Sequence, residues 1–184
     1  MQWLKLLNSK RRKDQAAQVT ENLPGMPLAI GRQEIERDYD RLLFAAPTRR
    51  LADKTQVFPL DRNDSVRTRL THSHEVANFA RGIGMRLAFE FKDKVFPDLT
   101  NELCVERDVP ALLAAIGLAH DLGNPPYGHQ GEAAMRTWFK RHLKPLVDES
   151  KITNKNIFND FYNFDGNSQT FRLVTKLQIL NDQY

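Results

Sequence analysis

The feature of this sequence that most constrains its fold is a segment that is apolar on nearly every face of a helix. The helix is expected to run from Ala111 to about Leu122, after an N-cap at Asp108 and a proline in the first turn. Such a helix belongs at the centre of a domain, because no face of it suits water. Gly123 and the Pro125-Pro126 pair end it directly after a His-Asp pair. We therefore expect other helices to surround this one and to enclose its polar end.

Further helices are predicted from apolar spacing and from the positions of proline and glycine. They are expected at about 33–46, 48–57, 66–91, 128–143 and 168–180. The 128–143 helix should be closed by Pro145, and the last helix should follow a turn at 163–167. Because no segment shows the alternation typical of strands, the predicted fold class is all-α.

The helix predicted at 66–91 carries a histidine on the face that should be buried. His72, Val76, Phe79, Ile83 and Leu87 follow one another at helical spacing. That spacing predicts one continuous inward stripe headed by His72. A second histidine, at position 74, lies about 200° around the helix and should face water.

Length, charge and cysteine content narrow the class of protein. The 184 residues suit one domain, with 27 basic and 23 acidic residues giving a net charge of +4 that weakly favours anionic partners. Cys104 is the single cysteine, so no internal disulfide or thiolate cluster can form, and a cytoplasmic setting is expected. No apolar run approaches the length of a membrane span, so no membrane partner is expected.

The predicted domain organisation is a flexible basic arm at 1–31 followed by one helical domain at 32–184. The arm contains the cluster Lys10–Lys13 and a turn-rich linker at 23–27. The chain stops within its last predicted helix, without a glycine cap. We therefore expect it to be an N-terminal part of a longer helical protein.

His120 and Asp121, at the end of the apolar helix, suggest a metal site. A buried ionised carboxylate needs a partner or a cation. An imidazole beside a carboxylate suits a divalent metal that accepts mixed ligands, such as Mn, Fe, Co, Ni or Mg. The inward His72 offers a third ligand, although a histidine at such a position, taken by itself, is more often a core residue than a ligand.

Three more positions suit phosphate chemistry. His129 and Glu132 share a helix face and form a candidate acid/base pair, although such a pair is also common on helix surfaces. Arg69 lies one turn before His72 and could hold phosphate oxygens, or could form a surface ion pair. Tyr127 offers an aromatic face for a sugar or base.

At this point the residues resemble the HD-domain metal phosphohydrolases, and more narrowly the deoxyguanosine triphosphate triphosphohydrolases. The resemblance covers about 33–180 and is carried by two principal motifs, 67–73 (RTRLTHS) and 120–132 (HDLGNPPYGHQGE). The flanking segments are 39–44 (YDRLLF), 49–58 (RRLADKTQVF) and 164–169 (FDGNSQ).

The resemblance implies hydrolysis of a deoxynucleoside triphosphate to deoxynucleoside and inorganic triphosphate. It implies metal ligation by His72, His120 and Asp121, acid/base catalysis by His129 oriented by Glu132, and substrate contacts from Arg69, Gln56, Asn124, Tyr127 and Asn167. It also implies a homo-oligomer, and contact with single-stranded DNA is possible for a basic surface.

Two departures from the family pattern leave alternatives open. The family's fourth ligand is an Asp well downstream, so this chain alone is expected to hold metal weakly. Some relatives have a histidine at the position of Asn124, so this chain lacks one possible proton donor to the phosphate. The alternatives are an HD-type nucleotide phosphatase or phosphodiesterase, and a non-catalytic fragment that binds nucleotide or single-stranded DNA.

Overall fold

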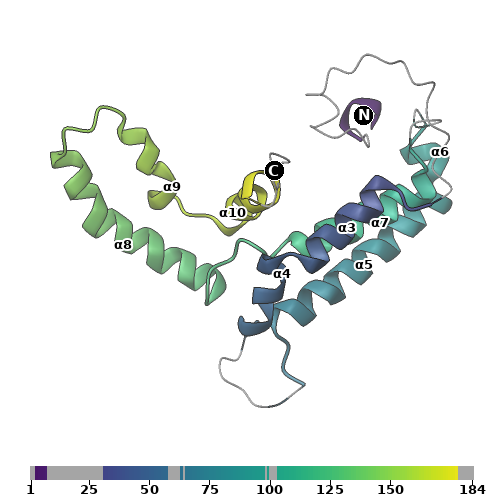
Figure 1. The fold of residues 1–184 in the computed structure, drawn as a ribbon, viewed down its shortest axis with the longest axis horizontal. Coiled ribbons are helices and arrows are strands. Elements are labelled where there is room, and N and C mark those ends of the chain that lie inside the picture. Colours follow the sequence, from purple (N-terminus) through teal and green to yellow (C-terminus); the bar gives the residue numbers. More distant parts are fainter. Residues whose placement is uncertain are drawn as a thin grey trace. The chain divides into compact units, whose positions relative to one another are not determined.

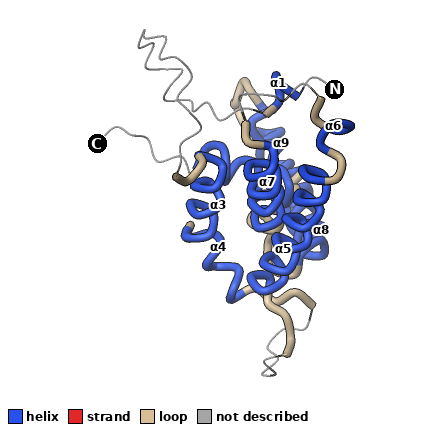
Figure 2. Tube along the Cα trace, turned by 90° about the vertical axis from the view of Figure 1, so that its right-hand side faces the viewer, coloured by secondary structure: helices blue, strands red, loops and turns tan. Residues whose placement is uncertain are grey.

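The structure is a computed structural model that describes residues 3–7, 31–57, 63, 65–97, 99 and 103–177 (Figure 1). The predicted basic cluster at 10–13 and the linker at 23–27 lie outside these residues, so the predicted arm stays a prediction. Regular structure in the described part is helical, as Figure 2 shows. Extended backbone pairs there only at an isolated bridge between Thr55 and Thr68. The all-α prediction is confirmed.

The first set of helical elements precedes the His-Asp pair. It comprises α1 (Trp3–Leu6), α3 (Glu34–Phe44), α4 (Ala46–Arg50), the 3-10 turn η1 (Leu51–Asp53), α5 (Arg69–Phe89), α6 (Lys92–Val95) and α7 (Val105–Ala119). The second set follows it and comprises α8 (Gly128–Glu149), η2 (Lys155–Phe158), α9 (Asn159–Tyr162), α10 (Gly166–Arg172) and the π-helical turn η3 (Leu173–Leu177).

The chain forms two compact units. The first contains residues 1–44 and 75–118, and the second contains residues 45–74 and 119–184. Helix α5 begins in the second unit and continues into the first. All the residues predicted to carry chemistry belong to the second unit.

The first unit is built around α5 and α7, which pack closely because small residues face one another. A Cβ added to Gly84 of α5 would lie 2.8 Å from the Cα of Pro110, and one added to Gly117 of α7 would lie 2.8 Å from the Cα of Ala77. The core beside them is made of apolar side chains from α3, α5, α7 and the segment before α7: Ile35, Ala88, Phe96, Leu99, Leu103, Val105 and Val109. Trp3 and Leu7 pack against this core.

The predicted inward stripe on α5 is wrong in register. Phe79 and Ile83 are 73% and 60% exposed. The buried positions are instead Ser73, Ala77, Gly84 and Ala88. Close helix packing selects small side chains for the contact, whereas the prediction assigned burial to the large apolar ones. His74 is exposed, as predicted.

Several helix bounds also differ from the predicted ones. Helix α7 begins at Val105 rather than after Asp108, because the Asp108 carboxylate accepts a hydrogen bond from the Cys104 amide and stabilises an earlier first turn. Helix α8 continues through Pro145 to Glu149, where the hydroxyl of Ser150 donates to the carbonyl of Val147.

The segment predicted as one helix at 48–57 divides into helix and extended chain. Helix α4 and η1 end at Asp53, and extended backbone follows. At the other end, α10 begins at Gly166, where Asp165 is the N-cap and accepts from the Ser168 amide. Among the described helices, none has the length and hydropathy needed to cross a bilayer.

Candidate metal centre

The first turn of α5 presents His72 and Arg69, and an extended segment pairs with the chain that leads into this turn. The backbone amide of Arg69 donates to the carbonyl of Lys54 at 2.9 Å, and the backbone amide of Gln56 donates to the carbonyl of Arg67 at 3.4 Å. These bonds fix the start of α5 to residues 54–56. The first turn of α5, which carries His72, is therefore anchored by contacts outside its own helix.

The second ligand-bearing segment is the turn that ends α7. His120 is the first residue after the helix, and the amide of Leu122 donates to the carbonyl of Ala119 at 3.1 Å. The backbone amide of Asn124 donates to the backbone carbonyl of Asp121 at 3.2 Å. Because α7 ends at Ala119, before the predicted end at about Leu122, His120 and Asp121 lie side by side in this compact turn and not in the helix.

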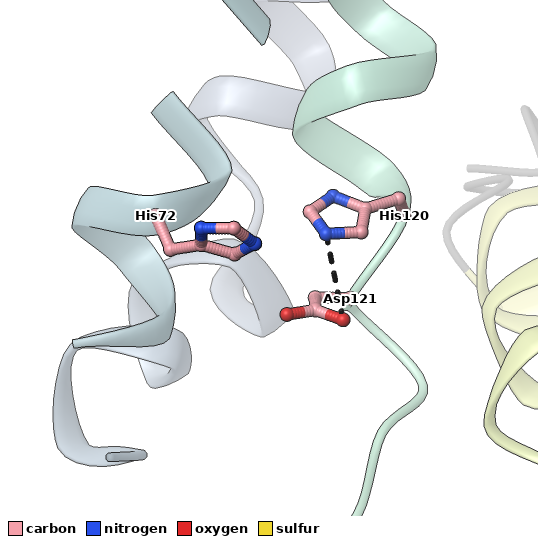
Figure 3. A group of neighbouring side chains, drawn as sticks. All are labelled: His72, His120 and Asp121. Carbon is pink, nitrogen blue, oxygen red and sulfur yellow. Dashed lines mark ion pairs between the residues drawn. The ribbon is translucent and has the colours of Figure 1, made fainter. Parts of the chain in front are cut away.

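His72, His120 and Asp121 come together as a cluster in the second unit (Figure 3). One ligand atom from each lies within 4.8 Å of the others. The two imidazole rings are 5.4 Å apart and nearly perpendicular, and the His120 Nε2 is 3.5 Å from the Asp121 Oδ1. Two imidazole nitrogens and a carboxylate form a donor set that fits a first-row divalent cation.

Both oxygens of the Asp121 carboxylate are held by neighbouring side chains. Arg69 Nη1 donates to Oδ2 at 2.9 Å, and Asn124 Nδ2 donates to Oδ1 at 2.6 Å. Arg69 and Asp121 are both buried, and the Arg69 Nε has no hydrogen-bond partner within the described part of the chain. Arg69 and Asn124 thus orient a candidate ligand, and their predicted contacts to substrate stay predictions.

Lys54 is a residue of this site that the sequence reasoning missed. Its Nζ donates to the carbonyl of Asn124 at 2.9 Å, across 70 positions of sequence. Burial lowers the pKa of Lys54, and the positive charge of Arg69 lowers it further. The sequence signal was its place two residues before Gln56 in a segment already matched to the family.

The predicted acid/base pair forms, but only one partner is on the surface. His129 Nδ1 lies 3.2 Å from Glu132 Oε2, and the His129 side chain is 87% exposed whereas that of Glu132 is 5% exposed. Arg136 Nη2 lies 3.5 Å from the same carboxylate oxygen. The arrangement directs Nδ1 toward Glu132 and leaves Nε2 as the nitrogen that a ligand can reach.

The other predicted substrate residues have distinct surroundings. Gln56 Oε1 is buried and has no hydrogen-bond partner among the residues described. Tyr127 is exposed and adopts a left-handed conformation, with φ of 64°, as the residue before α8. Asn167 is exposed in the first turn of α10. Their predicted roles are not tested by these positions.

Two comparisons, one with protein-family models and one with curated proteins, agree on the family of this chain. Residues 69–163 match the model of the HD domain, a span that includes His72, the His120-Asp121 pair and Glu132. The chain is 41% identical, over its whole length, to a deoxyguanosinetriphosphate triphosphohydrolase-like protein of Listeria innocua, of which it covers 39%.

Two further relatives agree. A protein of Pseudomonas aeruginosa with the same description is 40% identical over 81% of this chain and 32% of its own length. A deoxyguanosinetriphosphate triphosphohydrolase of Serratia proteamaculans is 34% identical over 83% of this chain and 34% of its own length. The chain therefore spans between about a third and two fifths of these curated relatives.

Proposed function

Because the chain belongs to the HD-domain family, we propose that it is the metal-binding part of a deoxynucleoside triphosphate triphosphohydrolase that prefers dGTP. The observation that carries the proposal is the convergence of His72, His120 and Asp121 within 4.8 Å of one another. The names of the relatives supply the proposed substrate and products.

In the proposed reaction, water attacks the α-phosphorus and the bond from that phosphorus to the 5′ oxygen breaks. The products are the deoxynucleoside and inorganic triphosphate, and the 5′ oxygen leaves with a proton. A divalent cation bound by His72, His120 and Asp121 would lower the pKa of a water molecule and offset phosphate charge.

Proton transfer is the role we propose for His129. The Glu132 carboxylate at Nδ1 favours the tautomer with its proton on that nitrogen, which leaves Nε2 as the nitrogen that can exchange a proton with the substrate. In the protonated state, Nε2 can donate to the departing 5′ oxygen. Glu132 is buried, and its other oxygen accepts a hydrogen bond from the Gly166 amide, so the carboxylate is fixed and can orient the exposed ring of His129.

Substrate binding is proposed for Arg69, Gln56, Asn124, Tyr127 and Asn167. Among the residues that the structure describes, the Arg69 Nε and the Gln56 Oε1 have no hydrogen-bond partner, so each has hydrogen-bonding capacity for a bound nucleotide. Lys54 adds a second positive charge near Arg69, which suits a triphosphate.

The cellular location, assembly and partners that we propose follow from the family and from the amino-acid composition. We place the protein in the cytoplasm because it contains a single cysteine. Assembly into a homo-oligomer is proposed from the family resemblance, and contact with single-stranded DNA is proposed from the net positive charge of the chain.

The test is to identify the products of dGTP hydrolysis by 31P NMR, using the whole protein that carries these residues with Mn²⁺ or Mg²⁺. The proposal expects tripolyphosphate and deoxyguanosine. A His129→Ala variant should lose most of the rate, whereas His142→Ala, a histidine further along α8, should retain it. Release of pyrophosphate or orthophosphate would indicate a different HD phosphohydrolase, and binding without turnover would indicate a non-catalytic nucleotide-binding protein.

A further inference from the structure

The start of α10 contacts both the proposed acid/base pair, through Glu132, and the turn that carries the candidate metal ligands His120 and Asp121. The Gly166 amide donates to Glu132 Oε1 at 3.0 Å, so the carboxylate that faces His129 is also anchored to this helix. A Cβ added to Gly166 would lie 2.0 Å from Asn124 Oδ1 and 2.7 Å from Glu132 Oε1. The backbone at Gly166 therefore approaches the site as closely as a glycine permits.

Thr170, one turn further along α10, contacts the turn that carries the metal ligands. Its hydroxyl accepts a hydrogen bond from the Gly123 amide at 2.9 Å and donates to the His120 carbonyl at 3.4 Å. A Cβ added to Gly123 would lie 2.2 Å from the Thr170 amide nitrogen. The hydroxyl thus binds the backbone on both sides of Asp121.

We infer that Thr170 is a positioning residue for the metal ligands, and that the first turn of α10 links these ligands to the Glu132 of the acid/base pair. The inference deepens the proposed function, since it takes the cation site of that proposal as its premise. Thr170 does not touch the cation. It acts by fixing the backbone that carries His120 and Asp121.

The physical reason is that the Thr170 hydroxyl bonds to backbone lying beyond the last residue of α7. The His120-Asp121 pair follows the last residue of α7, so the helix does not hold the two side chains in place. Residues that orient ligands from outside the first coordination sphere typically change metal affinity about 10–100-fold when they are removed. A hydroxyl that bonds both to an amide and to a carbonyl of the turn can serve that purpose.

The experiment measures Mn²⁺ affinity by calorimetry in the whole protein and in three variants. Thr170→Val keeps the shape and removes the hydroxyl, so it should weaken Mn²⁺ binding by about tenfold or more. Thr170→Ser restores the hydroxyl and should bind within about twofold of the parent. Thr175→Val is the matched control, because the Thr175 hydroxyl donates to the Phe171 carbonyl one turn back rather than to the turn at 120–124. Its affinity should equal that of the parent.

Equal Mn²⁺ affinity in Thr170→Val and the parent would overturn the inference, and so would a loss in Thr170→Ser as large as that in Thr170→Val. Circular dichroism establishes that each variant is folded before affinity is measured.

Hydrogen exchange in the unmodified protein supplies a test that needs no variant. Cation binding should slow amide exchange in the peptides that contain Gly123 and Gly166, and leave the peptide at 137–145 of α8 unchanged. Unchanged exchange at Gly123 and Gly166 on saturation with Mn²⁺ would overturn the link to α10.

These outcomes are distinct from those of the proposed function. A protein that binds Mn²⁺ through Thr170-dependent ligands but releases no tripolyphosphate would retain the positioning role and lose the proposed reaction. A protein that releases tripolyphosphate with full Mn²⁺ affinity in Thr170→Val would retain the reaction and lose the positioning role. Absence of Mn²⁺ binding by the parent would overturn both.

Discussion

Asp121 is a buried carboxylate whose negative charge is shared between an arginine and a proposed cation. Arg69 contacts one of its oxygens and Asn124 the other. Removing one partner of a buried ion pair is strongly destabilising, because the remaining charge stays buried without compensation. At this site a bound cation would supply that compensation, so the effect of losing Arg69 should depend on metal.

We predict that Arg69→Met destabilises the metal-free protein by about 3–5 kcal/mol. The loss should be smaller when Mn²⁺ is present, because the cation neutralises Asp121 in the absence of the guanidinium. Urea unfolding in EDTA and in Mn²⁺ measures the difference. The exposed Arg67 provides the control, since Arg67→Met should change stability little in either condition. The same destabilisation with and without Mn²⁺ would show that Asp121 does not share its charge with a cation.

Two glycines, Gly166 and Gly82, should differ in how substitution by alanine changes the stability of the protein. Gly166→Ala places a methyl group 2.0 Å from Asn124 Oδ1, so it should destabilise the protein by at least about 1–3 kcal/mol. Gly82, within α5, has no described atom within 4 Å of an added Cβ, so Gly82→Ala should stabilise by about 0.5–1 kcal/mol. Thermal unfolding of both variants checks the contrast. Equal effects would contradict the close approach of α10 to the site.

The helices show which parts of the structure the sequence could predict. The apolar sequence of α7 predicts its burial, and between Ala114 and Ala119 every residue except Ile116 is buried, while glycine and proline predict the turn that follows. The buried face of α5 was assigned wrongly, because side-chain size rather than hydrophobicity decides how closely α5 and α7 pack. The contacts of Lys54 and Thr170 could not be predicted, since they join residues 70 and 47 positions apart.

The start of α7 leads to a prediction about pH. Burial is the main cause that raises the pKa of Asp108 above its usual 3.8, and the negative charge of Glu36 adds to it. The folded state therefore favours the protonated acid, and this contribution to stability decreases as pH rises from 3.8 through the raised pKa.

Asp108→Asn should remove this component and flatten the dependence of unfolding free energy on pH in the range that begins at the ordinary pKa of 3.8 and rises through the raised pKa of Asp108. Urea unfolding across that range measures the slope. Asp93→Asn, at an exposed carboxylate of α6, is the control and should keep the slope of the parent. A slope in Asp108→Asn identical to that of the parent would show that Asp108 does not contribute to it.

At the scale of the whole molecule, the residues with proposed chemical roles belong to one of the two compact units. This unit is assembled from two separated stretches of sequence, 45–74 and 119–184. The first supplies His72 and Arg69, and the second supplies His120, Asp121 and Glu132. The motifs predicted this set of residues, because each lies in a segment with specific spacing. Their mutual arrangement depends on contacts from Lys54 and α10 that no local pattern encodes.

We propose that His72, His120 and Asp121 together hold one divalent cation, and Mn²⁺ binding to a pair of histidine variants tests this. His72 and His74 lie two residues apart on α5, and of these two His72 belongs to the cluster. We expect one Mn²⁺ per chain in calorimetry, a loss of affinity in His72→Ala of at least about 10–100-fold, and no change in His74→Ala. Binding of Mn²⁺ by His72→Ala with the affinity of the parent would contradict it.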